Sequence, residues 1–321
     1  MSAETKTPDT PVSVLTPPVS YRRLFEPGVS YKLLLAIDND DNAAAAIRIT
    51  AALSHRGANP TVLRSLELMA PISTGTAADT ALLYTQAALS EEFYEAQERV
   101  IKEKIRNILG RQPAWPVVTL IGDPPSTIVS EAEESAAELL VMGIHHHGTL
   151  EQALGENTAT RVMSKAVMPV FGVRPDTRQL PRRVLVATDF GNASWEAAHI
   201  AANLVDPRGV VILAHVAPTS LVIEEGDEGA ALVQREGIAH AFEKLANEIK
   251  TGKSIRVETV TRNGDPGTEL LAAAKQINPD IIATARQRHS LVSRLILGSV
   301  SRKLVRDGDW SMLITPPARG Q

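Results

Sequence analysis

Residues 281–304 read IIATARQRHSLVSRLILGSVSRKL and join a short apolar segment to a helix through a basic loop and a Gly-Ser step. The first residues are apolar enough for a buried parallel strand, and a helix is predicted from Ser299, directly after Gly298. The first amides of a helix have no internal partner and carry partial positive charge. We therefore expect Ser299, Val300 and Ser301 to be able to receive a phosphate group.

The same order of strand, loop, glycine step and helix occurs at residues 139–162, which read LLVMGIHHHGTLEQALGENTATRV. Two further pairs of motifs accompany it in the same order: KLLLAID at 32–38 with RVLVATD at 183–189, and IGDPPSTI at 121–128 with NGDPGTEL at 263–270. A period of about 150 residues indicates a duplicated domain, because the units of a solenoid are only about 20 to 50 residues long.

Length and composition narrow the class of protein. The 321 residues suit two domains of about 150 residues, each large enough for its own core. The absence of cysteine excludes disulfides, thiolate zinc sites and cysteine nucleophiles. A net charge of −4 gives no reason to expect nucleic acid or a polybasic membrane contact. The apolar runs fall far short of the ~20 residues that span a bilayer, so we expect a cytoplasmic protein.

The chain divides into four predicted parts. Residues 1–30 are rich in Pro, Ser and Thr, which favours a disordered or loosely docked arm. Residues 31–174 and 182–317 are the two domains, and a charged, proline-flanked linker at 175–181 joins them. Apolar strands alternate with helices in both domains, so we expect two α/β domains, each a doubly wound parallel sheet with right-handed crossovers.

Several polar residues lie at the ends of predicted strands. Asp38 and Asp189 end the first strand of each domain, where open α/β sheets bind ligands, although either carboxylate is also placed to cap the following turn or helix. Asp123 and Asp265 each precede a proline and are expected to cap helices. His215 also ends a strand, and there we expect a packed core residue.

Two other classes of function stay open as alternatives. His145, His146 and His147 suggest metal binding, but neighbouring residues on a loop diverge and no acidic cluster lies beside them. The basic loop containing Arg286 and Arg288 would suit an enzyme that hydrolyses a phosphate ester such as ATP. However, the sequence has no GxSxG, GxxxxGK[ST] or HExxH motif.

The ordered motifs resemble the universal stress protein (Usp) family in its tandem two-domain form. They are the strands ending in AID and ATD, the two GDP turns, ELLVMG at 138–143, and LGSVS at 297–301 with LGENTA at 154–159. The resemblance covers about residues 31–317. It implies a Rossmann-like sheet of five strands with about four helices in each domain. It also implies an internal pseudo-dimer paired through the last strands, and a role in stress response with protein partners that the sequence does not identify. A further homodimer stays open.

One subclass of the family binds ATP and is marked by a glycine, two residues, a glycine, nine residues, and then Gly-Ser or Gly-Thr. The first domain keeps Gly143, but His146 stands at the second glycine position and Gly155 is followed by Glu156. A carboxylate at that helix terminus repels phosphate. Asp38, Gly143 and Gly155 are therefore expected to be vestigial.

The second domain keeps more of this motif. Ala285 and Arg288 replace the first two glycines, but Gly298 and Ser299 remain at the matching spacing. An arginine in this position fills space near the phosphates, although its guanidinium is also able to pair with one. The resemblance therefore implies that any nucleotide site lies in the second domain.

We expect this site to hold ATP or another adenine nucleotide. Asp189 is assigned to the adenosine end, the amides and hydroxyls of Gly298–Ser301 to the phosphates, and Arg286 and Arg288 to screening their charge. The leading hypothesis is a regulatory or interaction module without catalytic activity.

Overall fold

A computed structural model describes residues 21–37, 43–67, 90–144, 158–217, 228–286 and 297–316. The first half contains β1 (Tyr31–Ile37), α1 (Ala43–Ser54), β2 (Ala58–Leu66), α3 (Glu91–Leu109), β3 (Val117–Ile121), α4 (Pro124–Glu134), β4 (Leu139–Gly143), α5 (Thr158–Lys165) and β5 (Val170–Val173). The second half contains β6 (Arg183–Ala187), α6 (Asn192–Leu204), β7 (Val210–Ala217), α7 (Glu228–Lys250), β8 (Arg256–Asn263), α8 (Pro266–Ile277), β9 (Ile281–Ala285), α9 (Ser299–Asp307) and β10 (Ser311–Thr315).

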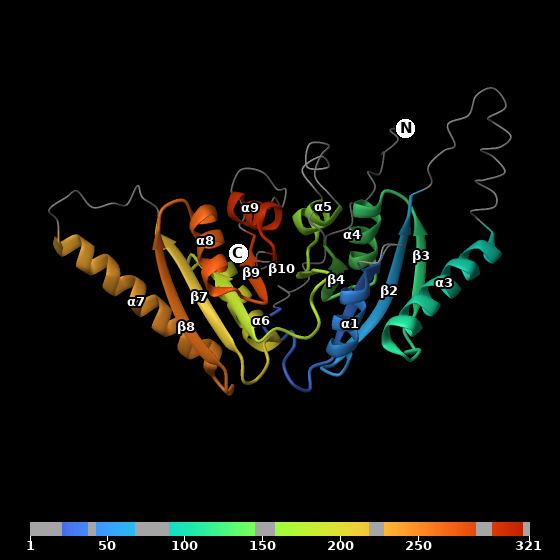
Figure 1. The fold of residues 1–321 in the computed structure, drawn as a ribbon, viewed down its shortest axis with the longest axis horizontal. Helices are drawn as coiled ribbons and strands as arrows, with labels where there is room; N and C mark the ends of the chain where they lie inside the picture. Colours follow the sequence, from blue (N-terminus) through green and yellow to red (C-terminus); the bar gives the residue numbers. More distant parts are fainter. Residues whose placement is uncertain are drawn as a thin grey trace, which may run out of the picture.

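The strands form one continuous sheet in the order β3-β2-β1-β4-β5-β10-β9-β6-β7-β8 (Figure 1). Every described pair is parallel except β5 with β10, which is antiparallel and pairs Leu313 with Phe171. Each half is therefore a five-stranded parallel sheet with the same strand order, as expected. The two halves join through their last strands and make an internal pseudo-dimer.

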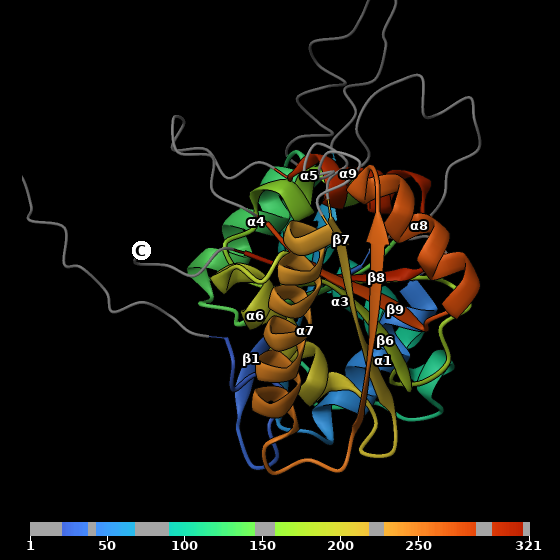
Figure 2. The same cartoon turned by 90° about the vertical axis from the view of Figure 1, so that its left-hand side faces the viewer.

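Helices cover both faces of the sheet in each half. In the first half α1 contacts α3 and α4 contacts α5; in the second α6 contacts α7 and α8 contacts α9. Figure 2 shows α7 and α8 on opposite sides of β7 and β8. Because both faces are covered, the central strands are almost wholly apolar. In β1, for example, every residue except Lys32 is buried.

The Gly-Asp-Pro turns start helices in both halves, as predicted. Asp123 accepts a hydrogen bond from the Ser126 amide at 3.2 Å, and Asp265 accepts one from the Thr268 amide at 2.9 Å. The proline that follows each aspartate lies in the first turn, where a missing amide proton costs no hydrogen bond. These aspartates therefore have a structural role as helix caps.

Asp265 has a second partner, because Lys303 of α9 lies 3.2 Å from its carboxylate. The hydrogen bonds from Thr268, with a smaller contribution from Lys303, lower the pKa of Asp265 to about 2. A carboxyl group with a lowered pKa in the folded state stabilises the fold above its ordinary pKa of 3.8, and this contribution is lost as the pH falls through 2.

Replacing Asp265 by asparagine should therefore make stability less dependent on pH. Asparagine caps a helix as well as aspartate does but carries no charge. We expect wild type to be slightly more stable than Asp265→Asn at pH 7, and the difference to vanish between pH 4 and pH 2. Thermal unfolding followed by circular dichroism measures it. A difference that stays constant over this range would contradict the assigned ionisation.

The segment before β1 packs against both halves. Tyr21, Leu24 and Phe25 are buried, although the sequence assigned them to a disordered or loosely docked arm. The Tyr21 amide donates to Glu196 of the second half at 2.7 Å, and its hydroxyl donates to the Val167 carbonyl of the first half at 3.0 Å. The structure differs from the expectation here because three large apolar side chains lie within five residues. The residues before Tyr21 lie outside the described part of the chain.

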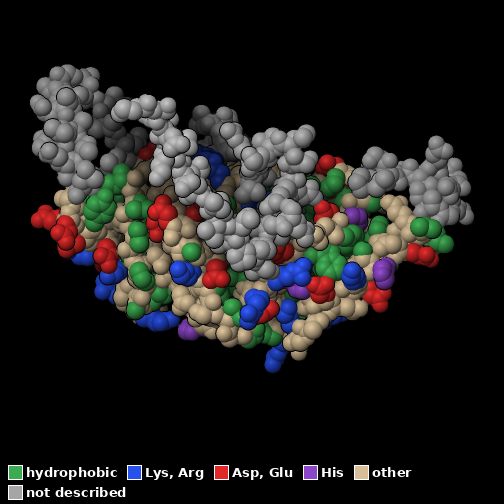
Figure 3. Space-filling model, turned by 180° about the vertical axis from the view of Figure 1, so that it is seen from behind, with side chains coloured by type: hydrophobic (Ala, Val, Ile, Leu, Met, Phe, Trp, Pro, Cys, Tyr) green, Lys and Arg blue, Asp and Glu red, His purple; other side chains and the backbone are tan. Residues whose placement is uncertain are grey.

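The surface carries charges of both signs. Acidic and basic side chains are interspersed over the face shown in Figure 3. Exposed large apolar side chains among the described residues include Val100 of α3, and Leu232 and Val233 of α7. Within the ranges that the structure describes, no helix combines the length and the apolar character needed to cross a membrane.

Candidate functional site

The order of the strands indicates a candidate ligand site at the carboxyl ends of β6 and β9. The connections from these neighbouring strands run in opposite directions along the sheet, to β7 on one side and to β10 on the other. Open α/β sheets bind ligands in the crevice that this reversal creates. A cavity of about 360 Å³ opens at this place.

The lining of this cavity brings together five of the residues assigned to the nucleotide site from the sequence. These are Asp189, Gly298, Ser299, Val300 and Ser301. Further polar lining residues that the sequence analysis did not assign to the site are Thr188, Ser194, His215 and Thr284. All of the latter lie at strand ends or in the first turn of a helix, so the strand register, once known, would have pointed to them.

Gly298 caps the amino end of α9 without any side-chain hydrogen bond. Its φ of −59° is open to any residue, and a Cβ atom added there would meet no atom of the described residues within 4 Å. The fold therefore gives no reason for glycine at this position, whereas a ligand approaching the backbone closely would give one. Ser299 is exposed, and Ser301 is buried with its hydroxyl 3.4 Å from the Ala285 carbonyl.

Asp189 follows β6 and fixes the turn that leads into α6. Its Oδ1 atom accepts hydrogen bonds from the Gly191 amide at 2.9 Å and from the Ser194 hydroxyl at 2.8 Å. The side chain is exposed and lines the cavity. The carboxylate therefore stabilises its own turn, as one interpretation of the sequence predicts, and its contact with a ligand remains a prediction.

His215 is only partly buried and lines the cavity, so the expectation of a packed core residue was incomplete. Its Nδ1 atom lies 2.9 Å from the Thr188 carbonyl oxygen. The ring lies 4.7 Å from that of Phe190, which in turn meets Phe242 of α7 at 5.0 Å. Phe190 has a φ of +61°, a left-handed conformation that is rare for a bulky residue. Aromatic packing on both sides holds Phe190 in it.

Arg286 does not line the cavity, and its assignment as a screening cation is corrected by the structure. Its side chain is 1% exposed and points across the junction of the two halves. The guanidinium donates to the carbonyl oxygens of Ser164, at 2.5 Å, and Ala166, at the end of α5. Burial lowers the pKa of Arg286 to about 10, so the group is still charged at neutral pH. A cation at a helix carboxyl terminus satisfies carbonyls that lack partners.

A similar contact crosses the junction in the other direction. Arg56 of the first half donates to the carbonyls of Asn203 and Leu204, at 3.3 and 2.9 Å, where α6 ends. Each half therefore supplies an arginine to a helix terminus of the other half. Arg286 is better explained as one member of this pair of contacts than as a ligand for phosphate.

The remaining candidates lie mostly outside the described residues. These are Asp38, Gly155, Arg288 and the run His145–His147. Gly143 is described and ends β4, where it pairs with Val173 of β5. The vestigial site of the first half and the histidine run remain predictions. Among the described residues, no group of three or more histidine, aspartate or glutamate side chains is placed to hold a metal ion.

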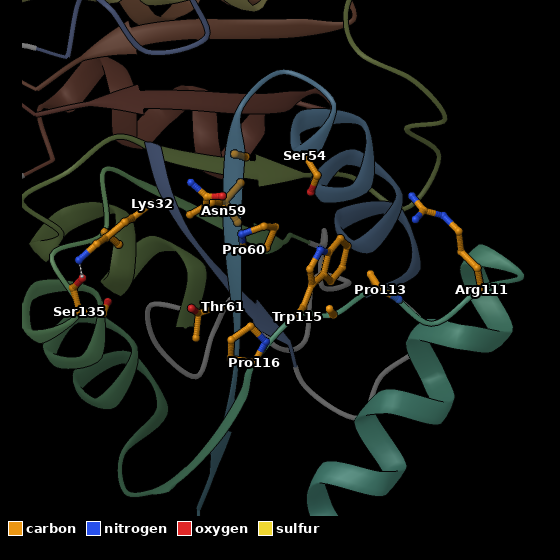
Figure 4. Close-up of a pocket in the computed structure, with 14 residues that line it drawn as sticks. Lys32, Ser54, Asn59, Pro60, Thr61, Arg111, Pro113, Trp115, Pro116 and Ser135 are labelled. Carbon is orange, nitrogen blue, oxygen red and sulfur yellow. Dashed lines mark hydrogen bonds between the residues drawn. The ribbon is translucent and has the colours of Figure 1, made fainter. Parts of the chain in front are cut away.

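A second, larger hollow of about 660 Å³ lies in the first half at the amino ends of β1 and β2 (Figure 4). Pro60, Trp115 and Arg111 contribute to its walls. Lys32 reaches from β1 and donates to the Ser135 carbonyl at 3.2 Å, so its charge is already engaged. We prefer the smaller cavity because it lies at the carboxyl ends of the strands and next to a helix amino terminus.

Fold and cavity define a class: a tandem, doubly wound α/β protein whose second half has a cavity between a strand-end aspartate and a helix amino terminus. The profile of the universal stress protein family matches residues 31–174 and 181–316. The chain therefore belongs to the universal stress protein family, in a tandem form.

Individual relatives agree with this assignment. A universal stress protein of Mycolicibacterium smegmatis (strain ATCC 700084 / mc(2)155) is 23% identical over 307 residues, which cover 92% of this chain and 100% of the relative. Universal stress protein YxiE of Bacillus subtilis (strain 168) is 26% identical over 137 residues, 38% of this chain and 90% of the relative. The crystal structure of a universal stress protein from Archaeoglobus fulgidus DSM 4304 has a TM-score of 0.61 at 22% identity, covering 91% of this chain and 98% of that one.

Proposed function

We propose that this protein is a stress-response regulatory module that binds an adenine nucleotide in its second half and does not turn it over. The observation that carries the proposal is that Asp189 and the first turn of α9 line the same cavity. This arrangement offers a carboxylate for hydroxyl groups and free amides for an anion within one crevice.

The phosphate end of the site is the amino terminus of α9. Its first amides have no intrahelical acceptor, and the helix dipole favours negative charge there. The open space in front of Gly298 lets a phosphate approach the backbone. No lysine or arginine belongs to the described lining of the cavity, so in this part of the chain amides and hydroxyls supply the contacts.

The adenosine end of the site is next to Asp189. A carboxylate at the end of a first strand is suited to accept hydrogen bonds from ribose hydroxyls. The Gly191 amide and the Ser194 hydroxyl fix Asp189 before any ligand arrives, which reduces the entropy lost on binding.

Binding without turnover is proposed because, among the described lining residues, no hydroxyl group is hydrogen-bonded to the imidazole of His215. Ser194 lies within hydrogen-bonding distance of Asp189 and of the Gly191 carbonyl, and Ser301 donates to the Ala285 carbonyl. His215 directs Nδ1 to a backbone carbonyl. A nucleophile requires a base within hydrogen-bonding reach. Among the described contacts of the lining, only Ser194 meets a carboxylate, that of Asp189, and this contact belongs to the turn that leads into α6.

Replacing Ser299 by glutamate tests the phosphate end. A carboxylate at this position repels a phosphate and competes with it for the amides of α9, so the affinity for ATP should fall about 30-fold or more. Isothermal titration calorimetry of the full chain with ATP and with AMP measures the change. The matched control is Ser254→Glu, which makes the same change at an exposed position before β8, at the opposite end of the sheet.

Two results would contradict the proposal. An unchanged affinity for ATP in Ser299→Glu would show that the phosphate does not bind at the amino terminus of α9. Steady release of phosphate from ATP by the wild-type protein would instead favour the hydrolytic alternative.

A further inference from the structure

We propose that His215 reads the base of the bound nucleotide and selects a 6-aminopurine over a 6-oxopurine. This inference rests on the proposed function, and deepens it by assigning base specificity to one atom. The side chain lines the cavity, and its orientation is fixed from two sides.

The first step is the tautomer of the imidazole. The Nδ1 atom of His215 lies 2.9 Å from the Thr188 carbonyl oxygen. A carbonyl oxygen only accepts hydrogen bonds, so Nδ1 must carry the proton. In the neutral ring the Nε2 atom is then a bare acceptor. Among the described residues, the hydrogen bond of the His215 ring is the one through Nδ1.

The second step is rigidity. Phe190 packs on the His215 ring with the two planes tilted by 35°, and Phe242 packs against Phe190 edge to face. The Thr188 carbonyl is itself held in place, because Thr188 directly follows β6 and its amide donates to the Ala214 carbonyl of β7 at 2.9 Å. The imidazole is therefore preorganised, and a fixed acceptor discriminates between ligands better than a mobile one.

The third step is position along the sheet. The α9 amino terminus follows β9, and His215 lies on β7, with β6 and Asp189 between them. Two strand spacings separate β9 from β7, which is about 10 Å. This is comparable to the span from the α-phosphate to the base of an extended nucleoside phosphate. With the phosphate on α9 and the ribose at Asp189, the base lies beside His215.

The fourth step is the chemistry of the base. Adenine presents an amino group at position 6, which donates hydrogen bonds, whereas hypoxanthine and guanine present a carbonyl oxygen there, which accepts them. A bare Nε2 pairs with the amino group. Opposite a carbonyl it faces a second acceptor, and the two acceptors form no hydrogen bond with each other. A site built around a ligand hydrogen bond rejects an analogue that cannot make it.

The experiment compares AMP with inosine 5′-monophosphate, which differs at position 6, by calorimetric titration of the full chain. Wild type should bind AMP about 10-fold or more tightly than the inosine nucleotide. His215→Phe keeps a ring to pack on Phe190 but removes the acceptor. In this variant the ratio should fall to about 3-fold or less, mainly through weaker AMP binding. The matched control is His240→Phe, an exposed position on α7 outside the cavity lining, and it should keep the wild-type ratio.

A measurement on the wild-type protein alone covers the case in which His215→Phe does not fold. Purine riboside 5′-monophosphate carries only hydrogen at position 6 and should bind about 5-fold or more weakly than AMP. Equal affinity for the two would overturn the inference, as would an unchanged AMP preference in His215→Phe. In both cases nucleotide binding itself would stand. Failure of all three nucleotides to bind wild type would overturn the proposed function and the inference with it.

Discussion

Replacing Leu313 by aspartate is expected to lower the free energy of unfolding by more than about 4 kcal/mol. Leu313 is fully buried in β10, opposite Phe171 of β5, where the two halves of the sheet meet. The substitution buries a carboxylate without a partner and removes apolar contacts at the same time. Because domains are stable by only about 5 to 15 kcal/mol, a loss of this size threatens the whole junction. Urea unfolding followed by circular dichroism measures it.

Leu232→Asp is the matched control for this change. Leu232 is 56% exposed on α7, so the same substitution should alter stability by no more than about 0.5 kcal/mol. If Leu313→Asp cannot be purified, Leu313→Ala keeps the test open with an expected loss of about 2 to 5 kcal/mol. Wild-type stability in both Leu313 variants would mean that β5 and β10 do not form the junction.

The sequence predicted the arrangement of strands because the same patterns occur twice. KLLLAID and RVLVATD are continuous apolar runs, and such runs indicate strands buried on both faces. The position of Gly298 and Ser299 after a loop also predicted the start of α9, which the structure confirms. These are local signals, in which the residue type and its neighbours along the chain determine the structure.

Side-chain direction was harder to predict because it depends on contacts between residues far apart in the chain. Arg286 follows β9 and is close in sequence to the Gly-Ser step, which suggested a phosphate ligand. In the structure its backbone amide donates to Thr315 of β10, and its guanidinium reaches the first half. The partial exposure of His215 at the cavity was not predicted for the same reason, because its orientation depends on the carbonyl of Thr188, which follows the neighbouring strand. Neither contact leaves a pattern in one sequence.

Arg286→Ala should therefore affect stability and leave nucleotide binding almost unchanged. The substitution removes the donors for the carbonyls of Ser164 and Ala166 and leaves an empty space at the junction, because Arg286 is 1% exposed. Lost hydrogen bonds from a charged donor and an unfilled cavity should together cost about 2 to 4 kcal/mol. Arg286→Met fills most of the space without donating, so the difference between the two variants isolates the cavity.

Comparing the effect of Arg286→Ala on stability with its effect on the affinity for ATP distinguishes the two roles of this arginine. If Arg286 caps α5, the affinity of the folded Arg286→Ala protein for ATP should stay within about twofold of wild type, since electrostatic effects at a distance are screened. If it screens phosphate charge, affinity should fall about 10-fold or more while stability changes little. The exposed Arg178→Ala is the control, and it should change neither quantity. Because the two roles predict opposite patterns, urea unfolding and calorimetry on one variant are enough to distinguish them.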